Sequence, residues 1–427
     1  MLIILSLLTG FSFIQAVDLF SKASSTALNY PEMAKGMIPF TGIFIPTFGA
    51  LYLVLTILFP FITIPLVSGE KQNGSLKLLL QTTQNLTEVI LIKVTSLIIV
   101  GAIIMLPSIS SIVIWKLIGG HIYLPALLNL ILGYSLYALI ITAISFLAAS
   151  FTETTATAAI VTLAFTLGSW VLDFAAMTQS WLSKISFVSL TALLTLYEKG
   201  LFSLSSTIQI LVFSLGVLLI TSFWLRPGNR LLPGLIRTLI VFTVLLLVLI
   251  PITKINYYKD VTENRFNSFS RTDEAALKQM SEELTITIHL SIQDSRLHDY
   301  RTGILDKLDR LIPSLNTINP YSASNGELTA ENDDLYGLIE YDYNGKHEES
   351  WSNSHQEVLP IIYQLAGISV VPDSLQQYPG YPLVSDASSY AIWFYVILPG
   401  LFIIFWLFIY SYKSKGKKVI YESKPNN

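Results

Sequence analysis

The sequence predicts a mainly α-helical membrane protein with about eight transmembrane helices and one small extracytoplasmic α/β domain between the last two. Three observations predict this fold class. Hydrophobic residues make up 52% of the chain and charged residues only 13%, whereas soluble domains carry about 25% charged residues. Eight apolar runs approach or exceed the roughly 20 residues that cross a bilayer. A single long polar block, residues 254–388, interrupts these runs.

The predicted spans divide the chain into four parts. Six spans form a membrane domain over residues 1–225, and 226–253 hold a cytoplasmic loop and the seventh span. Residues 254–388 form the outer domain, and 389–427 hold the eighth span and a basic tail. The first span is the weakest, because it lacks the basic start of a signal peptide and fits better as a span cut short at its beginning. The predicted spans are 2–17, 41–66, 93–115, 125–150, 157–176, 207–225, 235–253 and 390–411.

Lysine and arginine predict the orientation, because they concentrate in cytoplasmic loops. The loop with Arg226 and Arg230, which continues to Arg237, and the tail Lys413–Lys418 are therefore expected in the cytoplasm. Counting the spans between them places the N-terminus on the same side and residues 254–388 outside. The expected location is the bacterial cytoplasmic (inner) membrane, as a multi-pass protein with both termini cytoplasmic.

Composition also excludes several classes of function. The chain has no cysteine, which removes disulfides and thiol chemistry. The outer block holds 10 Lys+Arg and 21 Asp+Glu, so it is a poor candidate for binding nucleic acid. Three of its histidines, His298, His347 and His355, lie among carboxylates but not at metal-ligand spacing on one helix, so we expect neither a metal nor a cofactor.

The outer block alternates helix and strand patterns. Ser270 is a plausible N-cap for a helix that runs to about Glu283, and the alternation over 284–290 predicts a strand. The strongest hairpin signal joins two strands through Asn344-Gly345. Further elements are a helix over Tyr300–Leu315, a strand over Leu315–Asn319, a loop over Tyr321–Asp333, hairpin strands over Leu335–Tyr343 and Lys346–Trp351, and a helix over Gln356–Ala366.

A short polar segment between the second and third spans is the most informative feature. Residues 68–83 are too charged and too rich in glycine to belong to either neighbouring span. Leu76, Leu79 and Leu80 share one face of a helix, so an amphipathic helix on the cytoplasmic membrane face is one interpretation. That helix would present Lys71, Lys77 and Gln81 to a partner. An ordinary loop with an interfacial helix explains the pattern equally well.

Ionisable residues give no sign of an enzyme within the spans. Lys93, Lys116, Glu153 and Asp173 all lie at predicted span ends, where long side chains reach the interface. The pattern G-x-x-x-x-G-K-[ST] is missing from the sequence, so the chain lacks a P-loop for ATP. Any energy from ATP must therefore come from another chain, and ATPase activity is expected only in a partner.

The segment SGEKQNGSLKLLLQTTQNLTEVILIK, residues 68–93, resembles the cytoplasmic segment of type-2 ABC exporter permeases. The likeness covers roughly residues 1–225 and is greatest to permeases of gliding motility and of multicopper-enzyme maturation. It implies contact between this segment and a cytoplasmic P-loop ATPase subunit, and pairing of two permease halves, as a homodimer or with a second half. The implied ATPase-coupling residues are Glu70, Lys71, Gly74, Ser75, Leu76, Leu79, Leu80, Thr82 and Thr83, and Lys93 also matches the pattern.

A second resemblance covers residues 236–371. The segment KDVTENRFNSFSRTDEAALKQMSEELTITIHLS, residues 259–291, is similar to the start of the outer domain of gliding-motility ABC auxiliary (GldG-like) proteins. Asp260, Thr262, Phe266, Phe269, Ser270 and Ser291 carry the likeness. Together the two resemblances imply a permease half fused to its auxiliary partner.

Two functions of different classes follow from these observations. The first is the membrane-spanning permease subunit of an ABC-type export system, which couples ATP hydrolysis by a separate subunit to movement of a substrate or to work on an extracytoplasmic partner. The alternative is a non-transporting membrane anchor or assembly factor that holds an extracytoplasmic or surface protein through its α/β domain. A P-loop ATPase encoded next door would favour the first. A membrane-embedded enzyme is a third and weaker alternative.

Overall fold

The computed structural model describes residues 1–76, 78, 86–176, 189–226, 231–253, 255, 257–291, 294–323, 334–370 and 378–422. Within these residues, eight helical segments are long and apolar enough to cross a membrane, which confirms the predicted number of spans. The chain is a helical polytopic membrane protein. The spans are Leu2–Ala27, Phe40–Ile57, Leu86–Leu117, Leu124–Phe151, Thr155–Leu172, Leu204–Trp224, Leu232–Ile252 and Ser388–Ser411.

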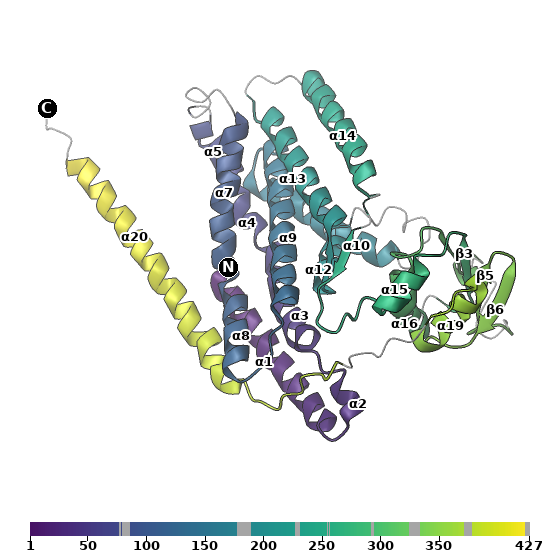
Figure 1. Cartoon of the computed structure of the whole chain (residues 1–427). Coiled ribbons are helices and arrows are strands. Elements are labelled where there is room, and N and C mark those ends of the chain that lie inside the picture. Colours follow the sequence, from purple (N-terminus) through teal and green to yellow (C-terminus); the bar gives the residue numbers. More distant parts are fainter. Residues whose placement is uncertain are drawn as a thin grey trace.

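These spans belong to a bundle of helices that Figure 1 shows from the side. We call the end of the bundle that carries α5 the α5 end, and the opposite end the β1 end. The helices before the sheet domain are α1 (Leu2–Ala27), α2 (Pro31–Ala34), a π-helical turn (Phe40–Phe44), α3 (Ile45–Ile57), α4 (Pro60–Thr63), α5 (Pro65–Gln72), α7 (Leu86–Ile104), α8 (Leu106–Leu117), α9 (Leu124–Phe151), α10 (Thr155–Ala176), α12 (Leu190–Glu198), α13 (Leu204–Trp224) and α14 (Leu231–Thr253). The last span continues through a 3-10 turn (Ser388–Tyr390) and a π-helical turn (Trp393–Ile397) into α20 (Leu398–Glu422).

Some span boundaries differ from the prediction, and prolines explain the main differences. The second span was expected over 41–66, but it ends at Ile57, and Pro60 and Pro65 each begin a new short helix. Proline is favoured at this first helical position because its missing N–H has no partner there. The third span was expected to begin at Lys93, but α7 begins at Leu86. Lys93 therefore lies inside the helix and not at its end.

Helix α9 is the centre of the bundle. It packs against α10, α12 and α13, and also against α3, α4, α5 and α7. Two thirds of its most apolar stretch (67%) are buried, compared with 6% for the span Leu232–Ile252 in α14. Gly133 allows α12 to approach α9 closely, because a Cβ added there would lie 2.4 Å from the Cβ of Tyr197. Helices α14 and α20 lie at the periphery (Figure 1).

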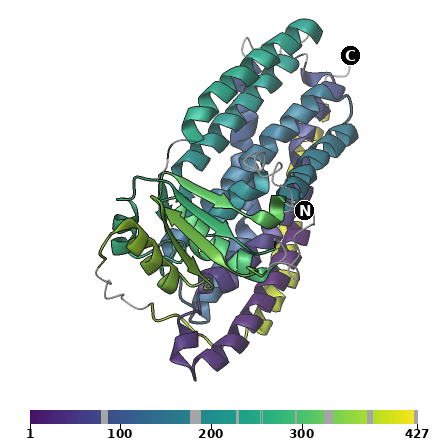
Figure 2. The same cartoon turned by 90° about the vertical axis from the view of Figure 1, so that its right-hand side faces the viewer.

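The polar block contains a four-stranded sheet with helices on one face. The strand order is β4-β3-β5-β6, in which β4 is parallel to β3 and the other pairs are antiparallel. Alternating residues of β3 (Leu284–Ile288) point into a core separate from that of the bundle. Figure 2 shows the sheet in front of the bundle. The elements are β2 (Tyr258–Asp260), α15 (Arg271–Leu277), β3, α16 (Ser295–Tyr300), a π-helical turn (Arg301–Leu305), α17 (Asp306–Leu308), β4 (Leu315–Ile318), α18 (Pro320–Ala323), β5 (Ile339–Tyr343), β6 (Lys346–Ser350) and α19 (His355–Ala366).

The element types of this domain agree with the sequence better than the boundaries do. The strands over 284–290 and 315–319, the hairpin turn and the last helix are confirmed, and Asn344 and Gly345 have positive φ angles of 50° and 75°. The first hairpin strand begins at Ile339 and not at Leu335, because turns occupy residues 334–337. Ser270 caps α15 as predicted, but the helix ends at Leu277 and not near Glu283. The helix expected over Tyr300–Leu315 was wrong at both ends, because Asp294 caps a start at Ser295 and α17 ends at Leu308. The expected loop over Tyr321–Asp333 begins within α18, and 324–333 lie outside the described residues.

A strand pair and the returning chain are among the contacts that join the sheet domain to the β1 end of the bundle. Strand β1 (Leu201–Ser203), between α12 and α13, pairs antiparallel with β2 at the start of the polar block. The returning segment 378–387, which we call the strap, runs along α1 and α2 before α20 begins (Figure 1). In the strap, Tyr381 donates its backbone N–H to the oxygen of Met37 (2.9 Å), and Leu383 donates to Oγ of Ser24 (3.0 Å).

Candidate functional site

The polar segment predicted to contact a partner starts as a helix of its own. Pro65 begins α5, which contains the charged residues Glu70 and Lys71 and ends at Gln72. Gly74 follows with a φ angle of +73°, a conformation that glycine adopts without the strain of a Cβ. Helix α5 therefore covers only the first residues of the segment, and most of the amphipathic helix expected through Leu76, Leu79 and Leu80 lies outside the described residues.

Glu70 pairs with a lysine inside a membrane span. Its carboxylate accepts a hydrogen bond from Nζ of Lys93 on α7, and the same ammonium group donates to the backbone oxygen of Leu66. The Lys93 side chain is only 13% exposed and that of Glu70 is 32% exposed. A partly buried lysine needs acceptors around it, and α5 supplies both of these. The pair therefore fastens α5 to α7.

Lys71 fastens α5 to the end of α9. Its Nζ donates to the backbone oxygens of Ser150 (3.0 Å) and Thr152 (2.9 Å). The last carbonyl groups of a helix lack partners within the helix and carry partial negative charge, so a lysine is favoured there. Gln72 adds a bond from Nε2 to the oxygen of Glu153 (3.0 Å). Lys71 therefore binds within its own chain, which differs from the expectation that it is presented to a partner.

The other predicted coupling residues are described only in part. Ser75 donates its Oγ–H to the oxygen of Glu70 (3.4 Å). Leu76 is 7% exposed and belongs to the core of the bundle, while Leu78 beside it is 66% exposed. Leu79, Leu80, Thr82 and Thr83 lie outside the described residues, as do Lys77 and Gln81.

Sequence reasoning missed the partners of α5. Lys93 was assigned to a span end, because nothing local shows that α7 begins seven residues earlier, at Leu86. The carbonyl groups of Ser150 and Thr152 carry no sequence signal, since every residue has one. One signal could have indicated the contact between α5 and α7. The polar segment contains an acidic residue, Glu70, and the next span contains a lysine, Lys93, which could pair with it.

A second polar cluster lies at the β1 end, where three separate segments meet. His121, between α8 and α9, contacts Glu263 of the polar block (Nε2 to Oε2, 2.8 Å) and stacks on the ring of Tyr381 in the strap (centroids 3.5 Å apart). The hydroxyl of Tyr381 donates to the other oxygen of Glu263 (2.9 Å). The cluster links the bundle, the sheet domain and the strap at one point, and no motif in the sequence indicates it.

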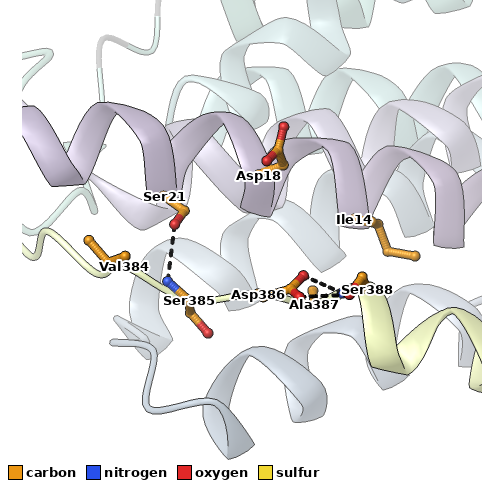
Figure 3. A pocket seen from close by; sticks show the side chains of 8 residues that line it. All are labelled: Ile14, Asp18, Ser21, Val384, Ser385, Asp386, Ala387 and Ser388. Carbon is orange, nitrogen blue, oxygen red and sulfur yellow. Dashed lines mark hydrogen bonds between the residues drawn. The ribbon is translucent and has the colours of Figure 1, made fainter.

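The strap also borders a cavity of about 590 Å³ against α1. Figure 3 shows its lining, with Asp18 on α1 and Asp386 on the strap. Asp18 pairs with Lys22 (2.6 Å), and Asp386 accepts from the backbone N–H and the hydroxyl of Ser388 (2.8 and 2.7 Å). Both carboxylates are therefore engaged.

The three histidines of the polar block that were considered from the sequence, His298, His347 and His355, lie in different places. His347 contacts Asp342 (2.9 Å) and Glu349 (3.3 Å) on the sheet. His355 begins α19 near the ring of Phe269, and His298 lines a different cavity, next to α12 and β1. No group of three metal-ligating side chains occurs within the described residues.

No protein-family model, curated protein or solved structure matches this chain significantly. The geometry alone therefore defines the candidate site: α5 with its bonds to α7 and α9. These bonds join one short helix directly to two spans.

Proposed function

We propose that the chain is the membrane-spanning permease subunit of an ABC-type export system, driven by a separate cytoplasmic P-loop ATPase. One observation carries the proposal: α5 is fastened to α7 through Glu70 and Lys93, and to α9 through Lys71. A partner that pushes on α5 would thereby move the central helix of the bundle. This is coupling between two sites through packed helices.

The orientation is part of the proposal. Helix α13 ends and α14 begins at the α5 end of the bundle (Figure 1). Arg226 directly follows α13 and Arg237 belongs to the first turns of α14, so both fall on the side expected in the cytoplasm. The sheet domain would then face the outside of a bacterial cytoplasmic membrane. Two ATPase subunits require two permease halves, so a homodimer or pairing with a second half is expected.

Charge reversal at Glu70 tests the coupling role. Glu70→Lys places two ammonium groups together at Lys93 and is expected to abolish stimulated ATP turnover and co-purification of the ATPase. The double variant Glu70→Lys, Lys93→Glu restores the pair within the chain and serves as the matched control. If α5 acts through the pair, the double variant regains turnover; if neither variant changes turnover or co-purification, the coupling role is wrong.

A separate observation favours the alternative function, a non-transporting membrane anchor. The sheet domain is joined to the bundle by β1–β2 pairing and by the contacts among His121, Glu263 and Tyr381. Such a fixed domain is suited to holding an extracytoplasmic protein without transport. Purification from the native membrane distinguishes the two functions, because the anchor would retain an outer protein and no ATPase.

A further inference from the structure

A cavity of about 520 Å³ lies between the bundle and the sheet domain. This volume is within the range of small-molecule sites, about 300–1,000 Å³. One wall comes from α12 and β1 of the bundle, and the other comes from β2, the loop after it and the helical segment from α16 to α17. A ligand in this cavity would therefore contact both regions of the molecule.

The sheet-domain wall is one face of that helical segment. Four residues of the wall are spaced four apart along the chain: His298, Thr302, Asp306 and Arg310. This spacing places them one above the other on the same side of a helix. His298 is exposed, so the cavity reaches the surface of the protein.

Arg310 has donors that the described residues do not use. Its Nη2 donates to the backbone oxygen of Asn267, and its guanidinium forms no ion pair with a carboxylate of a described residue. Burial lowers the pKa of the Arg310 guanidinium, because the charged form is poorly solvated there, while the charge of Asp306 acts in the opposite direction. A guanidinium has five N–H donors in a planar fork that matches the oxygens of a phosphate or carboxylate. Arg310 is therefore suited to an anionic ligand.

Asn267 connects Arg310 to a second cation on the bundle wall. The backbone oxygen of Asn267 accepts the bond from Arg310, and its Nδ2 donates to the backbone oxygen of Lys199. The Nζ of Lys199 lies 3.5 Å from Oδ2 of Asp306, which is longer than a usual N–H···O hydrogen bond. This ammonium group has three donors, so it can bind an anion in the cavity as well as face Asp306.

Lys307 adds a third positive charge next to the cavity. Its Nζ lies 5.6 Å from the ring centre of Phe266, and Phe266 lines the cavity. Lys307 forms no ion pair with a carboxylate of a described residue. Burial lowers the pKa of the Lys307 ammonium group, and the positive charge of Arg310 lowers it further. An anion nearby would stabilise both of these charges.

The carboxylates near these cations have other roles. Asp260 accepts bonds from the backbone N–H and the hydroxyl of Thr262 and from the backbone N–H of Asn267. Asp306 faces Lys199, and Asp309 is exposed. Because Asp306 and Asp309 also line the cavity, its charges favour a ligand that carries a cationic group beside its anionic group.

The cavity lies at the ends of two membrane spans. The span Leu204–Trp224 begins directly after β1, and the span Leu232–Ile252 ends shortly before β2. Tyr258 of β2 lines the cavity and is 38% exposed, and tyrosine is typical of the depth at which lipid headgroups lie. The bundle wall contributes Leu196 and Leu201. The cavity therefore has an apolar side towards the bundle and a charged side towards the sheet domain.

We propose that this cavity binds the headgroup of a zwitterionic membrane phospholipid, with its phosphate at Arg310 and Lys199. The start of the acyl chains would lie against Leu196. A free phosphate ion would meet the same two cations but would leave this apolar side uncovered. The site is separate from α5 and needs no ATPase, so the inference holds for a permease and for an anchor alike.

The test is native mass spectrometry of the delipidated full chain in mild detergent. The probes are dihexanoyl-phosphatidylethanolamine, dihexanoyl-phosphatidylglycerol, which lacks the ammonium group, dihexanoylglycerol, which lacks the phosphate, and inorganic phosphate. We expect one saturable site that binds phosphatidylethanolamine more tightly than the other three probes. Arg310→Gln should weaken this binding roughly tenfold to a hundredfold, because it removes charge-assisted hydrogen bonds to the phosphate.

Arg301→Gln is the matched control, since Arg301 is an exposed arginine of the same helical segment and does not line the cavity. It should leave the affinity unchanged. Lys199→Gln should weaken binding about tenfold, and it provides a second test if Arg310→Gln does not fold.

Three results would overturn the site: no saturable binding of phosphatidylethanolamine, equal binding of dihexanoylglycerol, or unchanged affinity in both Arg310→Gln and Lys199→Gln. Inorganic phosphate that binds as tightly as the phospholipid would show a site for a free anion and would overturn the assignment to a lipid. Equal binding of phosphatidylglycerol would overturn the choice of a zwitterionic headgroup. None of these results bears on ATPase coupling, so the two proposals fail separately.

Discussion

The bundle and the sheet domain each have one apolar core, but their outer surfaces differ. In the bundle, large apolar side chains face outwards, such as Leu232 (70% exposed) and Ile92 (69% exposed). On the sheet, the residues that alternate with the core are Thr285, Thr287, Glu340 and Asp342. An aqueous domain rarely leaves so much apolar surface open. The difference shows that the same chain is built for two solvents, lipid and water.

The two ends of the bundle also differ in the kind of hydrogen bonds that hold them. At the α5 end, side chains of α5 bind carbonyl and charged groups of the neighbouring helices. At the β1 end, a backbone strand pair and the strap join the bundle to the sheet domain. Under the proposed function, a displacement of α5 would therefore have to cross the bundle before it reached the sheet.

The largest expected effect is in the core of the sheet domain. Ile286 is fully buried in β3, and Ile286→Ala removes most of its side chain, which costs about 2–5 kcal/mol. We expect limited proteolysis to cut the sheet domain while the bundle stays resistant. Simultaneous loss of both regions would show that they fold as one unit and would contradict the distinction between two cores.

The second prediction compares the two solvents directly. Leu239 in α14 and Trp351 after β6 are equally exposed, at 65% each. Leu239→Asp should impair membrane insertion, because Asp in the middle of a span costs about 2.5–3.5 kcal/mol. Trp351→Asp faces water and should change stability by less than about 1 kcal/mol. Membrane insertion of Leu239→Asp is measured by its expression level and by its resistance to alkaline extraction. The stability of Trp351→Asp is measured by thermal unfolding. Equal tolerance of both substitutions would contradict a lipid-facing α14.

The sequence predicted the number and approximate places of the spans because lipid requires long apolar runs. It also predicted the hairpin, since Asn344-Gly345 carries a strong local signal. It did not predict β1 and β2, which have three residues each and are held together by pairing with each other. Nor did it find the role of Lys71, because the acceptors are backbone oxygens of a helix about eighty residues further along the chain. The bonds of α5 depend on tertiary packing, which leaves no local pattern in the sequence.

The third prediction concerns the strap. Gly380 has a φ angle of +71°, and a Cβ there would lie 1.6 Å from the oxygen of Ala34. Gly380→Ala should displace the strap from α2 at a cost of about 1–3 kcal/mol. Gly345→Ala serves as the comparison, because its φ angle is also positive but no atom lies within 4 Å of the added Cβ. Faster hydrogen exchange of the Tyr381 amide in the first variant alone would support the close contact. Equal exchange of the Tyr381 amide in the two variants would contradict a close contact between Gly380 and Ala34.

The smallest effect is a pH dependence confined to the sheet domain. The neighbouring Asp342 and Glu349 carboxylates raise the pKa of His347, and Asp342 has the larger influence. Because the folded state holds this proton more tightly, the stabilisation is complete below the unfolded pKa of about 6.5 and is lost as pH rises through the higher folded value. The side chains are exposed, so salt screens the pair and the effect is small. His347→Gln should reduce the pH dependence of the unfolding temperature of the sheet domain across this pH range. It should leave the unfolding temperature of the bundle unchanged. An unchanged pH slope in the variant would show that the carboxylates do not act through His347.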